Sequence, residues 1–220
     1  MKKILITTFL VVGLLFGMSP ASADLLNIPI ALPDILSNQT GTYEFTGASD
    51  TTPGRILFQA RPLTITFDGT DLVPIEATTN KQWSYLAEFL VDINGNFAGG
   101  VVDEDVMIQG MFEYMGTTYE GVLLTGEVTN FGFYDVPGPI ALFDYTFEVT
   151  GGLLAKEFGP VGVDITIAEF SNFLDDWSTE HSGSKVKHDT GPPVPIGSTL
   201  ALFGSGLAGL MVIRRRFRGE

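Results

Sequence analysis

Apolar and polar residues alternate along most of the chain between residues 40 and 177. Segments 63–68, 143–149 and 161–167 each place an apolar set on one side and a polar set on the other, as half-buried β-strands do. Only residues 170–177 are expected to form a short helix. Further strands are expected at residues 41–45, 55–60, 72–77, 85–93, 97–102, 106–112, 119–124 and 127–134.

Turn-forming residues separate these segments. They are Asp68-Gly69, Asn94-Gly95, Met115-Gly116 and Pro137-Gly138-Pro139. Asn94-Gly95 predicts a tight hairpin, because both residue types tolerate a positive φ. About ten short strands at this spacing predict an all-β fold, an antiparallel sandwich or barrel-like domain. The 17 Phe residues supply large side chains for its core.

The segments that flank this domain have a different composition. Residues 24–39 are apolar but contain Pro29 and Pro33, so we expect an extended lead-in that pairs with a sheet edge. Residues 178–195 contain Ser, Gly, Lys, His and Pro with few apolar side chains, which predicts a flexible linker. The β domain is therefore expected to comprise residues 40–177.

The first 23 residues have the three parts of a secretory signal peptide. Lys2 and Lys3 precede a mostly aliphatic run at residues 4–16, and Ala21-Ser22-Ala23 provides a small-x-small cleavage site. Cleavage after Ala23 would make Asp24 the first residue of the exported protein.

The C-terminal end has the pattern of a membrane helix. Residues 196–213 carry no charge and would span about 27 Å as a helix, close to the thickness of a bilayer core. The tail, residues 214–220, contains Arg214, Arg215, Arg216 and Arg218. The positive-inside rule places this tail in the cytoplasm and the domain outside.

Net charge and composition exclude several functions. The chain carries a formal charge of −14, and residues 24–213 hold six basic against 25 acidic residues. Such an acidic body argues against a nucleic-acid partner. Because the chain has no Cys, it has no disulfide framework, thiolate metal site or cysteine nucleophile.

The C-terminal segment also contains a more specific motif. Val194-Pro195 and Ser198-Thr199 precede Gly204-Ser205-Gly206-Leu-Ala-Gly209 and the arginine cluster. Together these residues resemble a PEP-CTERM sorting signal, although Ile196-Gly197 stand where that family has Glu-Pro or Leu-Pro. The resemblance covers residues 192–220.

This resemblance implies an exported protein of a Gram-negative bacterium. The family's processing enzyme is an exosortase, a membrane-embedded transpeptidase-like enzyme, and this chain would be its substrate. The implied destination is the cell surface or extracellular matrix, in association with exopolysaccharide or biofilm.

One segment matches part of a calcium-binding loop. Asp92, Asn94, Asn96 and Asp103 occupy positions 1, 3, 5 and 12 of that template. Position 6 is Phe97, however, where the template requires glycine, so we favour the hairpin interpretation and expect no metal. The adjacent acids Asp103-Glu104-Asp105 are interpreted as a solvated turn.

The sequence contains no recognisable catalytic motif. Glu88, Asp144, Glu148 and Asp164 alternate with apolar neighbours, so we expect them to face solvent. His181 and His188 fall in the expected linker, where no rigid surroundings could orient a catalytic base or a metal ligand. We therefore expect a non-enzymatic protein without a cofactor.

Two alternatives remain open. One is a carbohydrate-binding module, for which Trp83 and Tyr85, with Lys81 and Gln82, could form a sugar-stacking surface; a pair of aromatic side chains at the rim of the core is the simpler interpretation. The other is a hydrolase on the same β fold.

Overall fold

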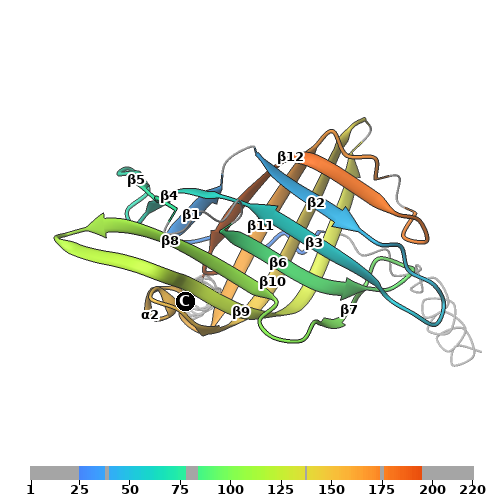
Figure 1. The fold of residues 1–220 in the computed structure, drawn as a ribbon, viewed down its shortest axis with the longest axis horizontal. Coiled ribbons are helices and arrows are strands. Elements are labelled where there is room, and N and C mark those ends of the chain that lie inside the picture. The colour runs from blue at the N-terminus through green and yellow to red at the C-terminus, as the bar shows by residue number, and fades with distance from the viewer. Residues whose placement is uncertain (1–24, 38–39, 78–83, 137, 174–175, 195–220) are drawn as a thin grey trace, which may run out of the picture.

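The computed structural model describes residues 25–37, 40–77, 84–136, 138–173 and 176–194 (Figure 1). The expected signal peptide, the membrane helix with its arginine tail and Trp83 lie outside these residues. Among the residues that are described, no helix is long and apolar enough to cross a membrane.

The described chain consists mainly of antiparallel strands, as the alternation predicts. One short helix, α2 (Ala155–Phe158), follows the tenth strand, whereas the described part of segment 170–177 is not helical. The strands are β1 (Asp34–Ser37), β2 (Gly41–Phe45), β3 (Gly54–Ala60), β4 (Pro62–Thr66), β5 (Val73–Pro74), β6 (Tyr85–Val91), β7 (Phe97–Gly100), β8 (Val106–Tyr114), β9 (Thr117–Val136), β10 (Ile140–Gly151), β11 (Val161–Glu169) and β12 (His181–Gly191).

Eight of these strands close into an antiparallel barrel, so the fold is a barrel with additional outer strands rather than a sandwich. The order around it is β11-β10-β9-β8-β6-β3-β2-β12, and β12 pairs back onto β11. Strands β1, β4 and β5 continue from β12, and β7 pairs with β6 (Figure 1). Two backbone hydrogen bonds between Glu76 and Met111, each 2.8 Å, connect the segment after β5 to β8.

Aromatic side chains fill the interior of the barrel. Phe58, Phe89, Phe143 and Tyr145 are fully buried, and their ring centroids lie 5.4–6.2 Å from one another where they meet. Barrels of this strand number have an interior that side chains can fill completely. The alternation in β10 is therefore assigned correctly, with Phe143, Tyr145 and Phe147 on the buried face.

The expected linker at residues 178–195 is wrong for its central part, because residues 181–191 form β12. This strand pairs with β2 through residues 181–186, with β11 through residues 184–191 and with β1 near its end. Its inward positions include His188 and Thr190, which are polar but buried. The polar composition that indicated a linker is thus that of a strand with a charged outward face and buried polar residues on its inward face.

The expected N-terminal lead-in also belongs to the sheet. Residues 25–33, which we call the N-terminal strap, run along the outside of the barrel, and β1 then pairs with both β12 and β4. The strap is extended, as predicted, but β1 lies between two strands rather than at an edge.

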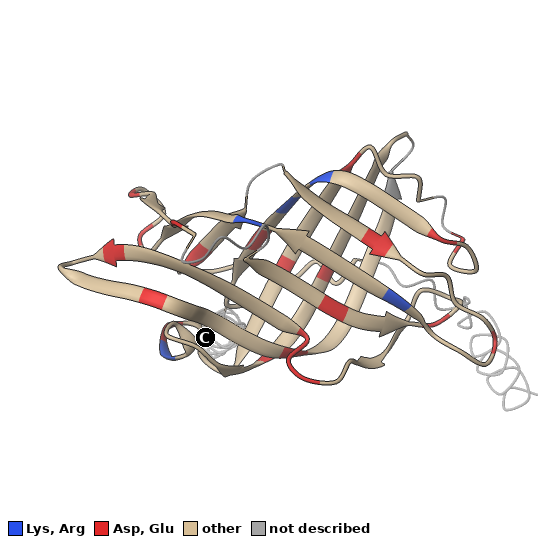
Figure 2. Cartoon of the chain, viewed as in Figure 1, with Lys and Arg blue, Asp and Glu red and all other residues tan. Residues whose placement is uncertain are grey.

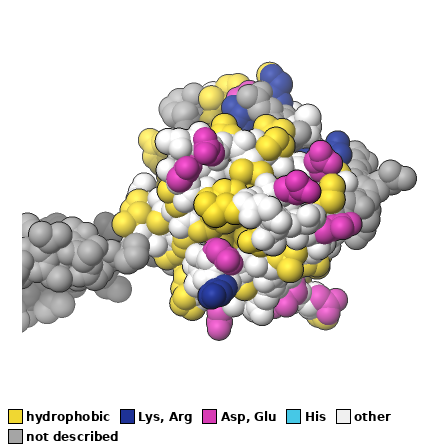
Figure 3. All heavy atoms as spheres, turned by 90° about the vertical axis from the view of Figure 1, so that its left-hand side faces the viewer, with side chains coloured by type: hydrophobic (Ala, Val, Ile, Leu, Met, Phe, Trp, Pro, Cys, Tyr) yellow, Lys and Arg dark blue, Asp and Glu magenta, His cyan; other side chains and the backbone are white. Residues whose placement is uncertain are grey.

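Charged side chains are mostly acidic and are distributed over the strands and loops (Figure 2). On the face shown in Figure 3, acidic side chains are dispersed among apolar ones and do not gather in a single patch. On this face acidic side chains outnumber basic ones.

Candidate functional site

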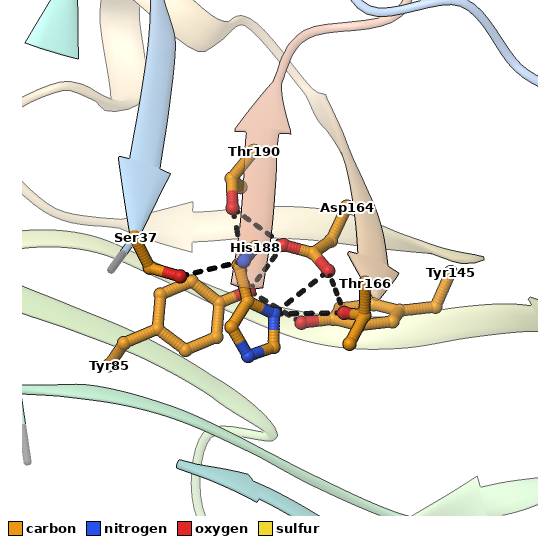
Figure 4. A network of polar contacts seen from close by, with 7 residues as sticks. All are labelled: Ser37, Tyr85, Tyr145, Asp164, Thr166, His188 and Thr190. Carbon is orange, nitrogen blue, oxygen red and sulfur yellow. Dashed lines mark hydrogen bonds and ion pairs between the residues drawn. The ribbon is translucent and has the colours of Figure 1, made fainter. Parts of the chain in front are cut away.

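A network of polar side chains lies inside the barrel (Figure 4). The strand register explains why they meet: Asp164 is opposite Thr190, Thr166 is opposite His188, and Tyr145 is opposite Asp164. Residues opposite each other on neighbouring strands point to the same face. The buried members are Tyr85, Tyr145, Asp164, Thr166, His188 and Thr190.

The Asp164 carboxylate is the centre of this network. Its Oδ2 accepts hydrogen bonds from the hydroxyls of Tyr85 and Thr190, both at 2.6 Å. Its Oδ1 accepts from the Thr166 hydroxyl at 2.5 Å and lies 3.1 Å from His188 Nδ1. Four donors therefore surround a carboxylate with no solvent exposure, which is how a buried charge is compensated.

His188 is held on several sides. Its Nδ1 lies 2.8 Å from Thr166 Oγ1. Because the Thr166 hydroxyl donates to Asp164, Nδ1 carries a hydrogen that both oxygens share. The ring stacks on Tyr85 with centroids 4.1 Å apart, and the backbone N–H donates to Ser37 Oγ at 2.6 Å. Its Nε2 is buried and has no hydrogen-bond partner among the described residues.

The environment changes the acidity of these groups. Burial alone would raise the pKa of Asp164, but the charge and hydrogen bond of His188, with the bonds from Thr166 and Thr190, hold that pKa below its ordinary value. Burial, followed by the charge of Asp164, raises the pKa of Tyr85 and of Tyr145 well above the usual range. The tyrosines therefore stay protonated, and Tyr145 can donate to the Tyr85 hydroxyl at 2.6 Å.

The Asp164–His188 pair resembles half of a hydrolytic triad, but the arrangement does not support that chemistry. In a triad the second ring nitrogen takes a proton from a hydroxyl or thiol within about 3 Å. His188 Nε2 faces no such group in the part of the chain that the structure describes. What the network can do is to fix β12 against β6, β10 and β11 and hold a charge within the core.

A second set of carboxylates lies on the outer face, near the strap. Asp34 Oδ1 and Asp189 Oδ1 are both buried, and no N–H or O–H group among the described residues donates a hydrogen bond to either atom. Burial, then hydrogen bonding and repulsion from Asp189, raise the pKa of Asp34 to about 8. Because its pKa is raised, the carboxyl group of Asp34 keeps a proton near neutral pH, and this proton can be shared with Asp189.

Asp144 holds the strap itself. Its Oδ1 accepts from the backbone N–H of Leu26 at 2.9 Å and its Oδ2 from that of Asn27 at 2.8 Å. Burial raises the pKa of Asp144, and these two bonds partly oppose that shift. The outer face of β10 is therefore covered at this point by the beginning of the described chain.

The prediction that four acids face solvent is correct for two of them. Glu148 is exposed, and Glu88 forms an ion pair with Arg55 at 3.0 Å on the outer surface. It is wrong for Asp144 and Asp164, which are buried.

The predicted hairpin at residues 92–96 is confirmed, and it uses the oxygens that a calcium ion would need. Asp92 Oδ1 accepts from the backbone N–H groups of Asn94 at 2.8 Å and Asn96 at 2.9 Å, and Gly95 has φ +82°. Burial would raise the pKa of Asp92, but the bonds from Asn96 and Asn94 leave it below its ordinary value. Among the described residues, no group of three acidic or histidine side chains is arranged to hold a metal.

Asp105 corrects the prediction of a solvated turn at residues 103–105. It is fully buried and accepts from the backbone N–H of Val101 at 2.7 Å and of Val128 at 2.8 Å. Asp103, the last residue of the calcium template, is exposed with φ +72°. Tyr85 lies inside the core with no exposed surface rather than at its rim, so it cannot form an exposed sugar-stacking surface.

Sequence reasoning missed the network because it assigned His188 to a linker and Asp164 to the solvent face. A usable signal does exist in residues 185–190, where Lys185, Lys187 and Asp189 alternate with Val186, His188 and Thr190. Charges at every second position indicate a strand with one solvent face.

Comparisons with protein-family models, curated proteins and solved structures found no match for this chain.

Proposed function

We propose that this chain is a non-enzymatic protein that is exported from a Gram-negative bacterium, sorted by its C-terminal segment and delivered to the cell surface or extracellular matrix. Its partners in this process are the membrane and an exosortase-type enzyme. The observation that carries the proposal is the order of segments in the sequence: a signal peptide, a β domain, Val194-Pro195, an apolar run and an arginine cluster.

The geometry of the chain ends supports this proposal. Ala31 N–H donates to the Pro192 carbonyl at 2.7 Å, and Val194 N–H donates to the Pro29 carbonyl at 2.9 Å. Ile30 and Pro193 form an antiparallel bridge between them. Because the two segments are antiparallel, the strap before Pro29 and the chain after Val194 leave this pair at the same end.

The position of β12 brings the barrel close to the expected processing site. The strand ends at Gly191, and Val194 is still hydrogen-bonded to the strap. The last described residue is thus the first residue of the Val194-Pro195 motif. Before cleavage, the barrel would be held directly at the membrane surface, and cleavage near this motif would release it as a folded unit.

Within the described residues, the buried network does not supply the alternative of a hydrolase with a catalytic group. Its carboxylate is satisfied by internal donors, and the described neighbours of His188 Nε2 include no nucleophile. The proposed association with exopolysaccharide in the matrix rests on the resemblance of the C-terminal segment to a sorting signal. The experiment that tests delivery to the outer fractions therefore also tests this association.

The experiment is to express the full chain in a Gram-negative host with and without its exosortase and to weigh the protein in the outer fractions. We expect a mass that begins at Asp24 and lacks Arg214–Glu220 when the enzyme is present, and retention in the inner membrane when it is absent. Protein in the outer fractions that keeps Arg214–Glu220 in the complete host would replace the sorting proposal with a permanent anchor.

A further inference from the structure

An open pocket of about 400 Å³ lies where β12 begins and β2 ends. Its wall consists of residues 44–46, 172 and 180–182, none of which belongs to the buried network. Its volume falls at the lower end of the range for small-molecule sites, about 300–1,000 Å³. The pocket lies away from the strap and from the expected processing site.

His181 forms a rigid part of this pocket. Only 5% of its surface is exposed, and its ring stacks on Phe45 with an interplanar angle of 13° and meets Phe173 edge-on. Its Nε2 lies 2.5 Å from the carbonyl oxygen of Asp176. Since a carbonyl can only accept, Nε2 carries the hydrogen. Nδ1 is the other ring nitrogen, which accepts when the ring is neutral, and it makes no hydrogen bond among the described residues.

The other polar groups of the wall are also mainly acceptors. Glu44 and Glu180 contribute two carboxylates, and the wall contains no Lys or Arg. Asn172 is fixed in orientation because its Oδ1 accepts from the Ser182 N–H at 2.6 Å, which leaves its amide N–H₂ for a ligand. The hydroxyls of Thr46 and Ser182 can serve in either role.

We propose that this pocket binds a protonated amino sugar. Two carboxylates and an imidazole acceptor require a ligand that brings positive charge and hydrogen-bond donors, and an ammonium group supplies both. The amide of Asn172 and the two hydroxyls match the ring hydroxyls of a sugar. The same charges repel uronic acids, phosphates and sulfates. This inference does not depend on the proposed sorting route.

The test is a calorimetric and NMR titration of the purified full chain with glucosamine at about pH 7, which is below the usual pKa of an amine and above the usual pKa of an imidazole. The matched ligand is N-acetylglucosamine, which keeps the ring and hydroxyls but has no charge. We expect glucosamine to bind roughly tenfold or more tightly than the acetylated sugar, because a hydrogen bond between charged groups contributes at least about 1.4 kcal/mol. Added salt should weaken the binding, since the pocket is open to solvent.

Variants locate the binding. Glu180→Gln and Glu44→Gln should each weaken glucosamine binding several-fold with little effect on the melting temperature, because both side chains are exposed. Glu148→Gln is the control, because it removes the same charge from an exposed position that does not line the pocket. Equal affinity for the two sugars, absence of binding, or equal losses in all three variants would overturn the proposal.

Discussion

At the scale of single residues, the main feature is a carboxylate inside the barrel that is compensated by the hydroxyl and imidazole groups around it. Asp164 accepts from Tyr85, Thr166 and Thr190 and lies beside His188. Buried ion pairs add little net stability compared with apolar residues, but breaking one leaves an uncompensated charge or donor. The network is therefore a source of specificity for one arrangement of β11 and β12.

Replacing Asp164 tests this arrangement. In the parent protein, the surrounding hydroxyls and the imidazole donate to the Asp164 carboxylate. Asp164→Asn replaces one accepting oxygen with an N–H₂ group, so donors face a donor. We expect a loss of about 3–5 kcal/mol in the free energy of unfolding. Urea denaturation of the full chain measures it, with Glu148→Gln as the exposed control. A loss below about 0.5 kcal/mol, the size of an ordinary surface change, would show that the network is not tightly packed.

The pH dependence of Asp164 has a defined sign. Its pKa is lowered in the folded protein, so its contribution to stability is present above the unfolded pKa, about 3.9, and is lost as the pH falls through the folded pKa.

The contribution of Asp34 to stability changes with pH in the opposite direction. Its folded pKa of about 8 lies above the ordinary value of 3.8, so its contribution is greatest below the unfolded value and is lost as the pH rises to about 8. Asp34→Asn keeps a donor toward Asp189 and cannot ionise. We expect this variant to unfold at a higher temperature than the parent at about pH 8, and the difference to disappear at about pH 4. Parallel melting curves of the two proteins across this interval would contradict the shared proton.

At the scale of elements, sequence periodicity predicts most strands but does not always identify which face is inside. Residues 41–45 are predicted with the bounds of β2, whereas segments 119–124 and 127–134 join into β9. In β11 the predicted inward set contains Ile165, yet Asp164 and Thr166 point to the interior and Ile165 is 36% exposed. Periodicity identifies two faces, and only the partners on β12 and β6 determine that the polar face is buried.

Strand β12 shows why a composition rule fails for a closed barrel. A linker is inferred when a segment cannot bury apolar surface, but His188 and Thr190 are buried by satisfying the polar groups of neighbouring strands. The candidate site was not predictable for the same reason. Its members come from four strands, and only the register of the closed sheet brings them together.

A glycine in β12 allows this element to be tested. A Cβ at Gly183 would collide with the ring of Tyr43, which is buried in the core. We therefore expect Gly183→Ala to lower the free energy of unfolding by about 1–3 kcal/mol, the usual cost of overpacking. Ser184→Ala, at the neighbouring exposed position, should change it by less than about 0.5 kcal/mol. Equal effects of the two substitutions would indicate a linker rather than a packed strand.

At the scale of the whole molecule, the two ends of the described chain are joined to each other and to the barrel. The strap bonds to residues 192–194 at one point and to Asp144 on β10 at another. A segment anchored at two places closes over the strands between them. The expected cleavage sites at both ends therefore flank a single closed unit, which is suited to release in folded form.

Replacing Asp144 should release the N-terminal strap from the outer face of β10. In Asp144→Asn one of the two accepting oxygens becomes an N–H₂ group that faces the backbone N–H of Leu26 or Asn27. A hydrogen bond to a charged group contributes about 1.5–3 kcal/mol, so we expect the amide hydrogens of these two residues to exchange at least roughly tenfold faster. Hydrogen exchange followed by NMR measures this, while amides of β8 and β9 and the variant Glu148→Gln provide the reference.

If the strap acts as one unit, the amides of Ala31 and Val194 should exchange faster as well, because their partners are Pro192 and Pro29. Faster exchange at Leu26 and Asn27 alone would show that the contact with residues 192–194 holds independently, and unchanged exchange at all four would show that Asp144 does not anchor the strap.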